Sequence, residues 1–257
     1  MSEQEYIITE VKDTVAFVYI NRTNVMNALN RRLIVELGKK IKDVCANAGV
    51  RAIIIAGKGD NFAAGADIGE MVQQNPHQAL AFSFNDVYTM IEQLPVPTCA
   101  AIKGYALGGG LELALTCDFR ICHTSARLGL PEIKLGIIPG AGGTQRLPRL
   151  IGLSRAKEVI FSGEFITAEK AYQWGLCDRL TDNDPVQEAE NFLSTIIKRP
   201  SLALHAAKKS IMFGLDSSLK EGLEYEALSF GILFSTYDQK EGMKAFIEKR
   251  KPNFKGC

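Results

Sequence analysis

Histidine is scarce in this 257-residue chain, and its cysteines follow no recognisable spacing. The three histidines, at positions 77, 123 and 205, belong to no H-E-x-x-H motif, which argues against a zinc site. The six cysteines include no C-x-x-C pair, as expected for small buried side chains of a reduced protein. We therefore predict no disulfide framework, no metal site and a cytoplasmic location.

An excess of charge of either sign is also missing. Thirty Lys and Arg oppose 29 Asp and Glu, giving a net charge of +1, whereas a nucleic-acid-binding surface needs a strong basic excess. No uncharged apolar run of about 20 residues occurs, so no membrane span is expected. The acidic start, Met-Ser-Glu-Gln-Glu, does not resemble a signal peptide. The hydrophobic content of 46% is that of an ordinary globular protein.

Several common catalytic motifs are absent from the sequence. No serine lies in G-x-S-x-G, and no G-x-x-x-x-G-K-[ST] is present, which excludes a nucleophile elbow and a phosphate-binding P-loop. The segment from Gly57 begins like G-x-G-x-x-G but has Phe62 in place of the third glycine, which argues against a dinucleotide-binding turn. An enzyme of this sequence has to work with backbone groups and carboxylates.

Hydrophobic periodicity predicts alternating strands and helices over about the first 150 residues. We expect strands at residues 6–10, 15–21, 52–56, 98–103 and 119–123, and helices at 27–48, 76–93 and 111–116. Beyond residue 152 we expect only helices, at residues 154–161, 168–173, 185–198, 201–213, 219–234 and 236–249. Thr236 and Gln239 form a plausible capping box for the last helix. The fold class is therefore α/β, with a largely parallel sheet and an all-helical C-terminal third.

Two glycine-rich loops offer backbone N–H groups. Residues 104–110 end in three consecutive glycines at an expected helix start, where the missing Cβ atoms expose N–H groups to a bound anion. Close packing of strand against helix is an equally good explanation of these glycines. The loop at residues 62–68 could supply a second N–H group, and Asp67 in it suits a helix cap.

Two glutamates stand among apolar neighbours, Glu112 directly after the triple glycine and Glu132 in the segment LPEIKLG. An isolated carboxylate in such surroundings is costly, and burial raises its pKa into a range suited to proton transfer. A structural ion pair with Arg120 or Lys134 is a comparable explanation for either glutamate alone. Together, and beside the two loops, they indicate acid–base chemistry on a polarised carbonyl compound.

At this point the sequence resembles the enoyl-CoA hydratase (crotonase) family over essentially its whole length. The matching segments, in order, are NRTNVMNAL at 21–29, FAAGADI at 62–68, GYALGGGLELA at 104–114, LPEIKLG at 130–136, IPGAGGTQRL at 138–147 and AFIEKR at 245–250.

The resemblance implies a spiral core of repeated ββα units at residues 1–195 and a helical oligomerisation region at 196–257, in a trimer or a hexamer built as a dimer of trimers. It implies that the N–H groups of Ala66 and Gly109 hold the thioester oxygen of an acyl-CoA. By position, Glu112 would activate water and Glu132 would protonate the α-carbon, converting a trans-2-enoyl-CoA to a 3-hydroxyacyl-CoA without a separate cofactor. Further substrate contacts implied by the resemblance are Ala64, Asp67, Ile68, Gly108, Leu130 and Gly140.

Three positions depart from the family pattern. Thr23 replaces the usual proline after Arg22, which affects local turn chemistry. Leu130 stands where close hydratases often carry glutamine, which affects substrate preference, and Gly69 stands where many members carry a lysine that contacts CoA. The sequence leaves open another reaction of the family, namely isomerisation, thioester hydrolysis or decarboxylation, and a non-catalytic acyl-CoA-binding or RNA-binding relative. We expect a short-chain enoyl-CoA hydratase, because isomerases commonly keep only one of the two glutamates.

Overall fold

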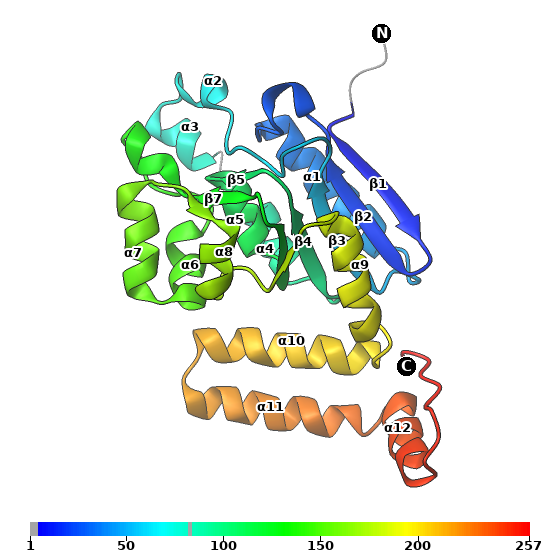
Figure 1. The fold of residues 1–257 in the computed structure, drawn as a ribbon. Coiled ribbons are helices and arrows are strands. Elements are labelled where there is room, and N and C mark those ends of the chain that lie inside the picture. The colour runs from blue at the N-terminus through cyan, green and yellow to red at the C-terminus, as the bar shows by residue number, and fades with distance from the viewer. Residues whose placement is uncertain (1–4, 82–83) are drawn as a thin grey trace. The chain divides into compact units, whose positions relative to one another are not determined.

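A computed structural model describes residues 5–81 and 84–257, which form two compact units. The first unit runs to Leu94 and resumes at Thr98–Asn191, and the second comprises Pro95–Pro97 and Phe192–Cys257. Helix α9 (Pro185–Ile196) contains both the unit boundary and the boundary expected after residue 195. Figure 1 shows the course of the chain through these elements.

The first unit is built on a six-stranded sheet in the order β1-β2-β3-β4-β6-β9. Its strands are β1 (Ile7–Lys12), β2 (Val15–Ile20), β3 (Ala52–Gly57), β4 (Thr98–Ile102), β6 (Phe119–His123) and β9 (Arg179–Thr181). β1 and β2 form an antiparallel hairpin, and every other neighbouring pair is parallel. β3 and β4 are apolar and almost wholly buried, as expected of strands covered on both faces.

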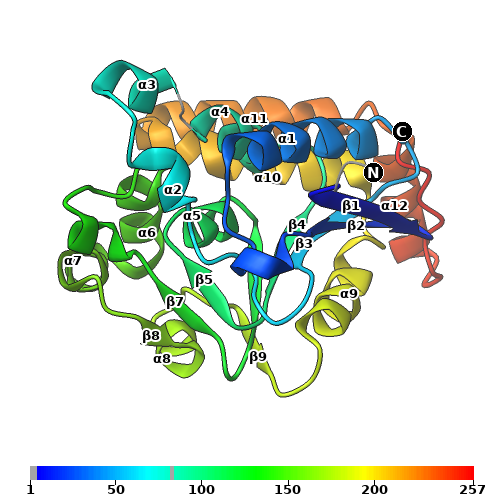
Figure 2. The same ribbon diagram turned by 90° about the horizontal axis from the view of Figure 1, so that it is seen from above.

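A second, three-stranded sheet has the order β5-β7-β8. Its members are β5 (Tyr105–Leu107), β7 (Arg127–Gly129) and β8 (Ile166–Thr167). β4 and β6 of the large sheet are each followed directly by a strand of the small one, so the chain coils from sheet to sheet. Figure 2 shows helix α5 (Gly109–Leu115) inside this coil. The arrangement confirms the expected spiral core, and it places the start of α5 in the interior.

Helices complete the first unit. They are α1 (Arg31–Cys45), α2 (Ile68–Met71), α3 (Pro76–Ala81), α4 (Asn85–Glu92), α5, α6 (Gly143–Ile151), α7 (Leu153–Ser162), α8 (Ala168–Gln173) and the start of α9, with 3-10 turns η1 (Thr23–Val25) and η2 (Pro131–Leu135). α1 illustrates how the local sequence specifies a helix. Asn30 caps its first turn, and its apolar stripe, which includes Leu33, Leu37 and Ile41, is buried.

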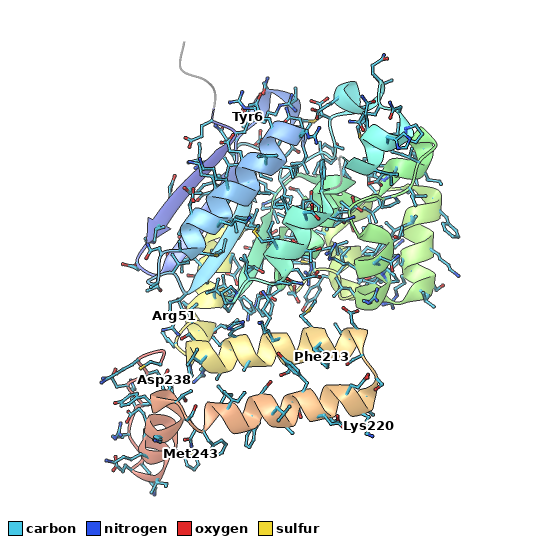
Figure 3. The ribbon with its side chains drawn as sticks, turned by 180° about the vertical axis from the view of Figure 1, so that it is seen from behind. Tyr6, Arg51, Phe213, Lys220, Asp238 and Met243 are labelled. Atoms are coloured by element: carbon cyan, nitrogen blue, oxygen red, sulfur yellow. The ribbon has the colours of Figure 1, made fainter. Side chains whose placement is uncertain are left out.

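The second unit consists of the end of α9, α10 (Ser201–Asp216), α11 (Leu219–Leu233) and α12 (Tyr237–Ile247). Phe213 of α10 stacks on Tyr225 of α11 with ring centroids 4.5 Å apart, and Figure 3 shows Phe213 between these two helices. Ser218 and Glu221 form a reciprocal capping box at the start of α11. In the described part of the chain, no helix combines the length and apolarity needed to cross a membrane.

The structure corrects several expected elements. The helix expected from residue 27 begins at Arg31, because Asn27 has φ +58° and its side chain binds the Lys58 and Asn61 carbonyls. The single helix expected at 76–93 consists of α3 and α4, and residues 82–83 between them lie outside the described residues.

The expectation of helices alone beyond residue 152 is wrong, since β8 and β9 lie there. Strands of two and three residues are too short to show a period of two. The capping box expected at Thr236 is half formed: Thr236 Oγ1 accepts the Gln239 N–H, but the Gln239 side chain donates to Met243 Sδ.

Candidate active site

A cavity of about 770 Å³ lies in the first unit, beside the start of α5. It brings together the two glycine-rich loops and both glutamates singled out in the sequence. Its lining residues are Ala64, Gly65, Ala66, Ile68, Met71, Gln74, Ala79, Leu80, Phe84, Asn85, Gly108, Gly109, Glu112, Pro131, Glu132, Leu135, Gly136, Ile137, Ile138, Gly140 and Ala141. Most of this surface is apolar, as in pockets that bind organic ligands.

The triple glycine satisfies both interpretations left open by the sequence. A Cβ on Gly110 would collide with the Ala63 carbonyl, so this glycine serves close packing. Gly108 has φ +49° and precedes α5, and its own N–H donates to the Gly129 carbonyl at 2.9 Å. Gly109 is the first residue of α5, and within the described residues its N–H has no intramolecular acceptor. That N–H is therefore available to a ligand in the cavity.

The second N–H comes from Ala66, which forms a parallel bridge with Leu29. In this bridge Leu29 N–H donates to the Gly65 carbonyl at 2.8 Å, and Asp67 N–H donates to the Leu29 carbonyl at 2.9 Å. Alternation along an extended segment turns the intervening Ala66 N–H away from Leu29. It has no acceptor among the described residues, and Ala66 lines the cavity with Gly109. The pair has the composition of an oxyanion hole.

Glu112 lies in the first turn of α5 and is only 3% exposed. Its Oε1 accepts the N–H groups of Ala141 and Gly143, both at 2.8 Å. Burial raises the pKa of Glu112, while these two hydrogen bonds and the charge of Arg146 oppose the rise. The carboxylate is thus held through one oxygen and kept closer to its ionised form than burial alone would allow.

Glu132 lies at the start of η2, where Pro131 occupies the first position. Burial, with a smaller contribution from the charge of Glu112, raises the pKa of Glu132 to about 7. Its Oε2 is buried and has no hydrogen-bond partner in the described part of the structure. The site thus holds two carboxyl groups whose surroundings favour different protonation states, the pattern of an acid–base pair.

Comparison with known proteins identifies the family over almost the whole chain. Residues 10–257 match the family model described as enoyl-CoA hydratase/isomerase. The chain belongs to this family. A crotonyl-CoA hydratase of Syntrophomonas wolfei is 41% identical over 254 residues, covering 97% of this chain and 98% of the relative. A short-chain-enoyl-CoA hydratase of Clostridium acetobutylicum is 40% identical, covering 97% of both chains.

Solved structures of the enoyl-CoA hydratase/isomerase family confirm the fold. The crystal structure of an enoyl-CoA hydratase from Bacillus anthracis matches with a TM-score of 0.93 and 40% identity, covering 98% of this chain and 100% of the other. The family resemblance and the crotonase-type fold predicted from the sequence are therefore confirmed.

The remaining predicted contact residues fall into two groups. Ala64, Ile68, Gly108 and Gly140 line the cavity, together with the four residues described above. Asp67 and Leu130 are not among its lining residues. The Asp67 carboxylate accepts the Gly69 N–H at 3.1 Å and Arg22 Nη1 at 2.7 Å, so it caps α2 and fastens the Ala66 loop. Leu130 is fully buried and packs against Gly143.

The structural ion pairs that could have explained the glutamates are formed with other partners. Arg120 pairs with Asp178 at 3.2 Å, and Lys134 pairs with Glu164 at 2.7 Å. Both basic residues are thereby engaged away from Glu112 and Glu132. This leaves acid–base chemistry as the interpretation that the geometry favours.

Three residues of the site were not singled out from the sequence. Tyr88 of α4 is fully buried and donates its hydroxyl to the Gly109 carbonyl at 2.7 Å. Arg146 of α6 and Glu92 of α4 form an ion pair beside Glu112. Arg146 stands inside the segment IPGAGGTQRL that carries the family resemblance, so a signal was present for it. Nothing in the local sequence distinguishes Tyr88 or Glu92.

Proposed function

We propose that this protein is a trans-2-enoyl-CoA hydratase that adds water reversibly to give a 3-hydroxyacyl-CoA. The main support for this proposal is that Glu112 and Glu132 line one cavity beside the Ala66 and Gly109 N–H groups. The hydratase names of the similar proteins support the reaction, and it is the function expected from the sequence. Coenzyme A enters as part of the substrate, and the proposed reaction uses no metal or separate cofactor.

The thioester oxygen lies between the N–H groups of Ala66 and Gly109. These donors stabilise the negative charge that develops on this oxygen during addition, and such preorganised donors contribute about 3–4 kcal/mol each. The polarised carbonyl withdraws electrons from the conjugated double bond and makes C3 electrophilic. The apolar lining of the cavity strengthens this effect because little water screens the charge.

Glu112 is the base and Glu132 is the acid in the direction of hydration. With Oε1 held by two N–H groups, Oε2 of Glu112 takes a proton from water as the oxygen bonds to C3. Electrons move from the double bond onto the thioester oxygen and return as Glu132 delivers its proton to C2. The proton on Glu112 then passes back to Glu132, directly or through solvent. Dehydration reverses the roles.

Short acyl chains are the proposed substrates. The names of two similar proteins specify crotonyl-CoA and short-chain enoyl-CoA, and this is the support for the assignment. Leu80 and Phe84 contribute apolar surface to the cavity on the side of α3 and α4. They suit a hydrocarbon chain.

We also propose that the protein works as a homo-oligomer, a trimer or a hexamer, in the cytoplasm. The second unit exposes large apolar side chains along α11 and α12, and such surface is typical of subunit interfaces. They include Leu219, Leu223, Leu228, Phe230, Ile232, Phe246 and Ile247. The structure describes all six cysteines and joins none of them in a disulfide, which supports a reducing compartment. Light scattering at micromolar concentration tests the oligomeric state.

The decisive experiment follows the loss of the conjugated-thioester absorbance of crotonyl-CoA, with chiral identification of the 3-hydroxybutyryl-CoA product. Wild-type protein should turn over, and Glu112→Gln and Glu132→Gln should each lower kcat by at least about 10³-fold. Wild-type-like rates in either variant would refute the mechanism. Turnover of a 3-enoyl-CoA without hydration of crotonyl-CoA would instead identify an isomerase.

A further inference from the structure

Arg146 contacts the loop whose Ala141 and Gly143 N–H groups bind Glu112. Its Nη1 donates to the Ala141 carbonyl at 3.1 Å, and the Ala141 N–H donates to Glu112 Oε1 at 2.8 Å. The next residue, Gly142, has φ +100°, and a Cβ there would collide with the Arg146 guanidinium. The loop can close over Arg146 only because position 142 has no side chain.

Glu92, the last residue of α4, fixes this guanidinium. Arg146 Nε and Nη2 donate to Glu92 Oε1 and Oε2 at 2.9 and 2.8 Å, a bidentate geometry. Both side chains are largely buried, with 15% and 21% of their surface exposed. The pair therefore joins α4 to α6 and fixes the peptide that donates to Glu112. A continuous set of contacts runs from Glu92 through Arg146 and Ala141 to Glu112.

The charges around Glu112 come from three elements. α6 supplies Arg146, α4 supplies Glu92 and the neutral Tyr88 hydroxyl, and η2 supplies Glu132. Arg146 is the cation that acts on Glu112 in this set, and it opposes the effect of burial on the pKa of that carboxyl. A catalytic base has to be ionised before water attacks, so the position of this cation bears directly on the chemistry.

We infer that Arg146 and Glu92 are positioning residues for hydration: their ion pair orients the Glu112 carboxylate through Ala141, and the charge of Arg146 favours the ionised form of that carboxylate. The inference rests on the proposed role of Glu112 as the base. It assigns the two parts of the ion pair different effects. The position of the Glu112 carboxylate depends on both residues, whereas its ionised form is favoured by the charge of Arg146 alone among the two.

The test measures kcat and kcat/KM for crotonyl-CoA from pH 5 to pH 9 in Arg146→Gln, Arg146→Lys and Glu92→Gln. All three should lower kcat, by about 10-fold to 100-fold for Arg146→Gln, because the loop shifts. The acid limb of kcat/KM should move to higher pH in Arg146→Gln. In Arg146→Lys it should stay at the wild-type pH, and in Glu92→Gln it should stay there or move down.

A purely structural role would lower kcat in all three variants without moving the acid limb, and that result overturns the inference. An upward shift in Glu92→Gln overturns it as well, and this arm remains decisive if Arg146→Gln does not fold. Asp178→Asn is the matched control, because it breaks the ion pair of Arg120, a buried arginine of the same unit. Its kcat and acid limb should be those of the wild type. Failure of the base assignment is seen separately, as retained activity in Glu112→Gln.

Discussion

Glu132 Oε1 borders the space that a side chain on Gly108 would need: a Cβ built at Gly108 would lie 2.9 Å from that oxygen. Gly108 also has φ +49°, a backbone conformation that glycine adopts most readily. The residue before Gly109, whose N–H belongs to the proposed oxyanion hole, thus limits the position of the proposed acid. The proposed acid and the proposed oxyanion hole are coupled through one backbone position.

Substituting Gly108→Ala should therefore damage catalysis more than folding. The added methyl group has to displace the Glu132 carboxylate, and a shift of about 1 Å in a reacting group can lower kcat by about 100-fold. Gly175→Ala is the control, because Gly175 has φ +80°, nothing within 4 Å of a built Cβ, and no place in the cavity.

Gly175→Ala should lose about 1–2 kcal/mol of unfolding free energy in urea, since alanine disfavours positive φ. Gly108→Ala should lose more, because the ψ of −128° at Gly108 lies outside the left-handed helical region. Only Gly108→Ala should lose turnover of crotonyl-CoA. Equal kcat values in the two variants would contradict the proposed coupling.

Removing the acid should make the protein more stable above neutral pH. The pKa of Glu132 is raised to about 7 by burial, against an ordinary value of 4.5. From pH 4.5 upward the unfolded state loses its proton first, so the cost to the folded state grows until about pH 7 and is constant above it. At about 1.4 kcal/mol per pKa unit, this cost is at most on the order of 3 kcal/mol.

Glu132→Gln removes that cost, so its free energy of unfolding should exceed the wild-type value at pH 8 and match it at pH 4.5. Urea titrations at the two pH values measure the difference. A variant that is no more stable than the wild type at pH 8 would show that the carboxyl is not destabilised by its site.

The pH dependence of kcat/KM for hydration should be bell-shaped. Hydration needs Glu112 ionised and Glu132 protonated, so kcat/KM should fall on the acid side as Glu112 gains a proton. It should fall on the alkaline side as Glu132 loses its proton, at an apparent pKa of about 7. The two carboxyl groups interact, so both limbs belong to the pair. The residual rate of Glu132→Gln should lack the alkaline limb, and an unchanged limb in that variant would assign it to another group.

Much of the fold was predictable because its main signals are local. The strands at Ala52–Gly57 and Phe119–His123 and the helix at Ala168–Gln173 lie close to their expected limits. The small sheet was not predictable, because β5, β7 and β8 have two or three residues each and are stabilised by pairing with distant segments. The start of α1 was missed because the left-handed conformation of Asn27 depends on carbonyls more than 30 residues away.

The residues of the site likewise include some that the sequence predicts and some that it does not. Glu112 and Glu132 were detectable because a carboxylate in an apolar segment is unusual wherever the chain folds. Glu92 and Tyr88 were not, since an acidic and an aromatic residue on an amphipathic helix are ordinary, and their partners Arg146 and Gly109 are distant in sequence. Asp67 shows that a recognisable motif does not reveal which residues its side chain contacts. Its motif was recognisable, but its partner Arg22 is apparent only in three dimensions.

The ion pair of Arg22 with Asp67 should matter for the oxyanion hole. Arg22 Nη1 binds Asp67 Oδ2 at 2.7 Å and the Ala28 carbonyl at 3.0 Å, so it joins the two segments whose bridge orients the Ala66 N–H. Arg22 holds the pKa of Asp67 below its ordinary value. The stabilisation is therefore present above about pH 4 and is lost as the pH falls through the lowered pKa.

Asp67→Asn keeps an oxygen to cap α2 but loses the ion pair. We expect a loss of about 1 kcal/mol of unfolding free energy at pH 7, because the pair is partly exposed, and a smaller loss once the pH falls below the lowered pKa of Asp67. The kcat for crotonyl-CoA should fall by about 10-fold while KM changes less, because the oxyanion hole acts mainly in the transition state. Glu158→Gln, which breaks the exposed pair of Lys170 with Glu158, is the control and should leave kcat unchanged. A wild-type kcat in Asp67→Asn, with the stability loss present, would restrict this ion pair to a structural role.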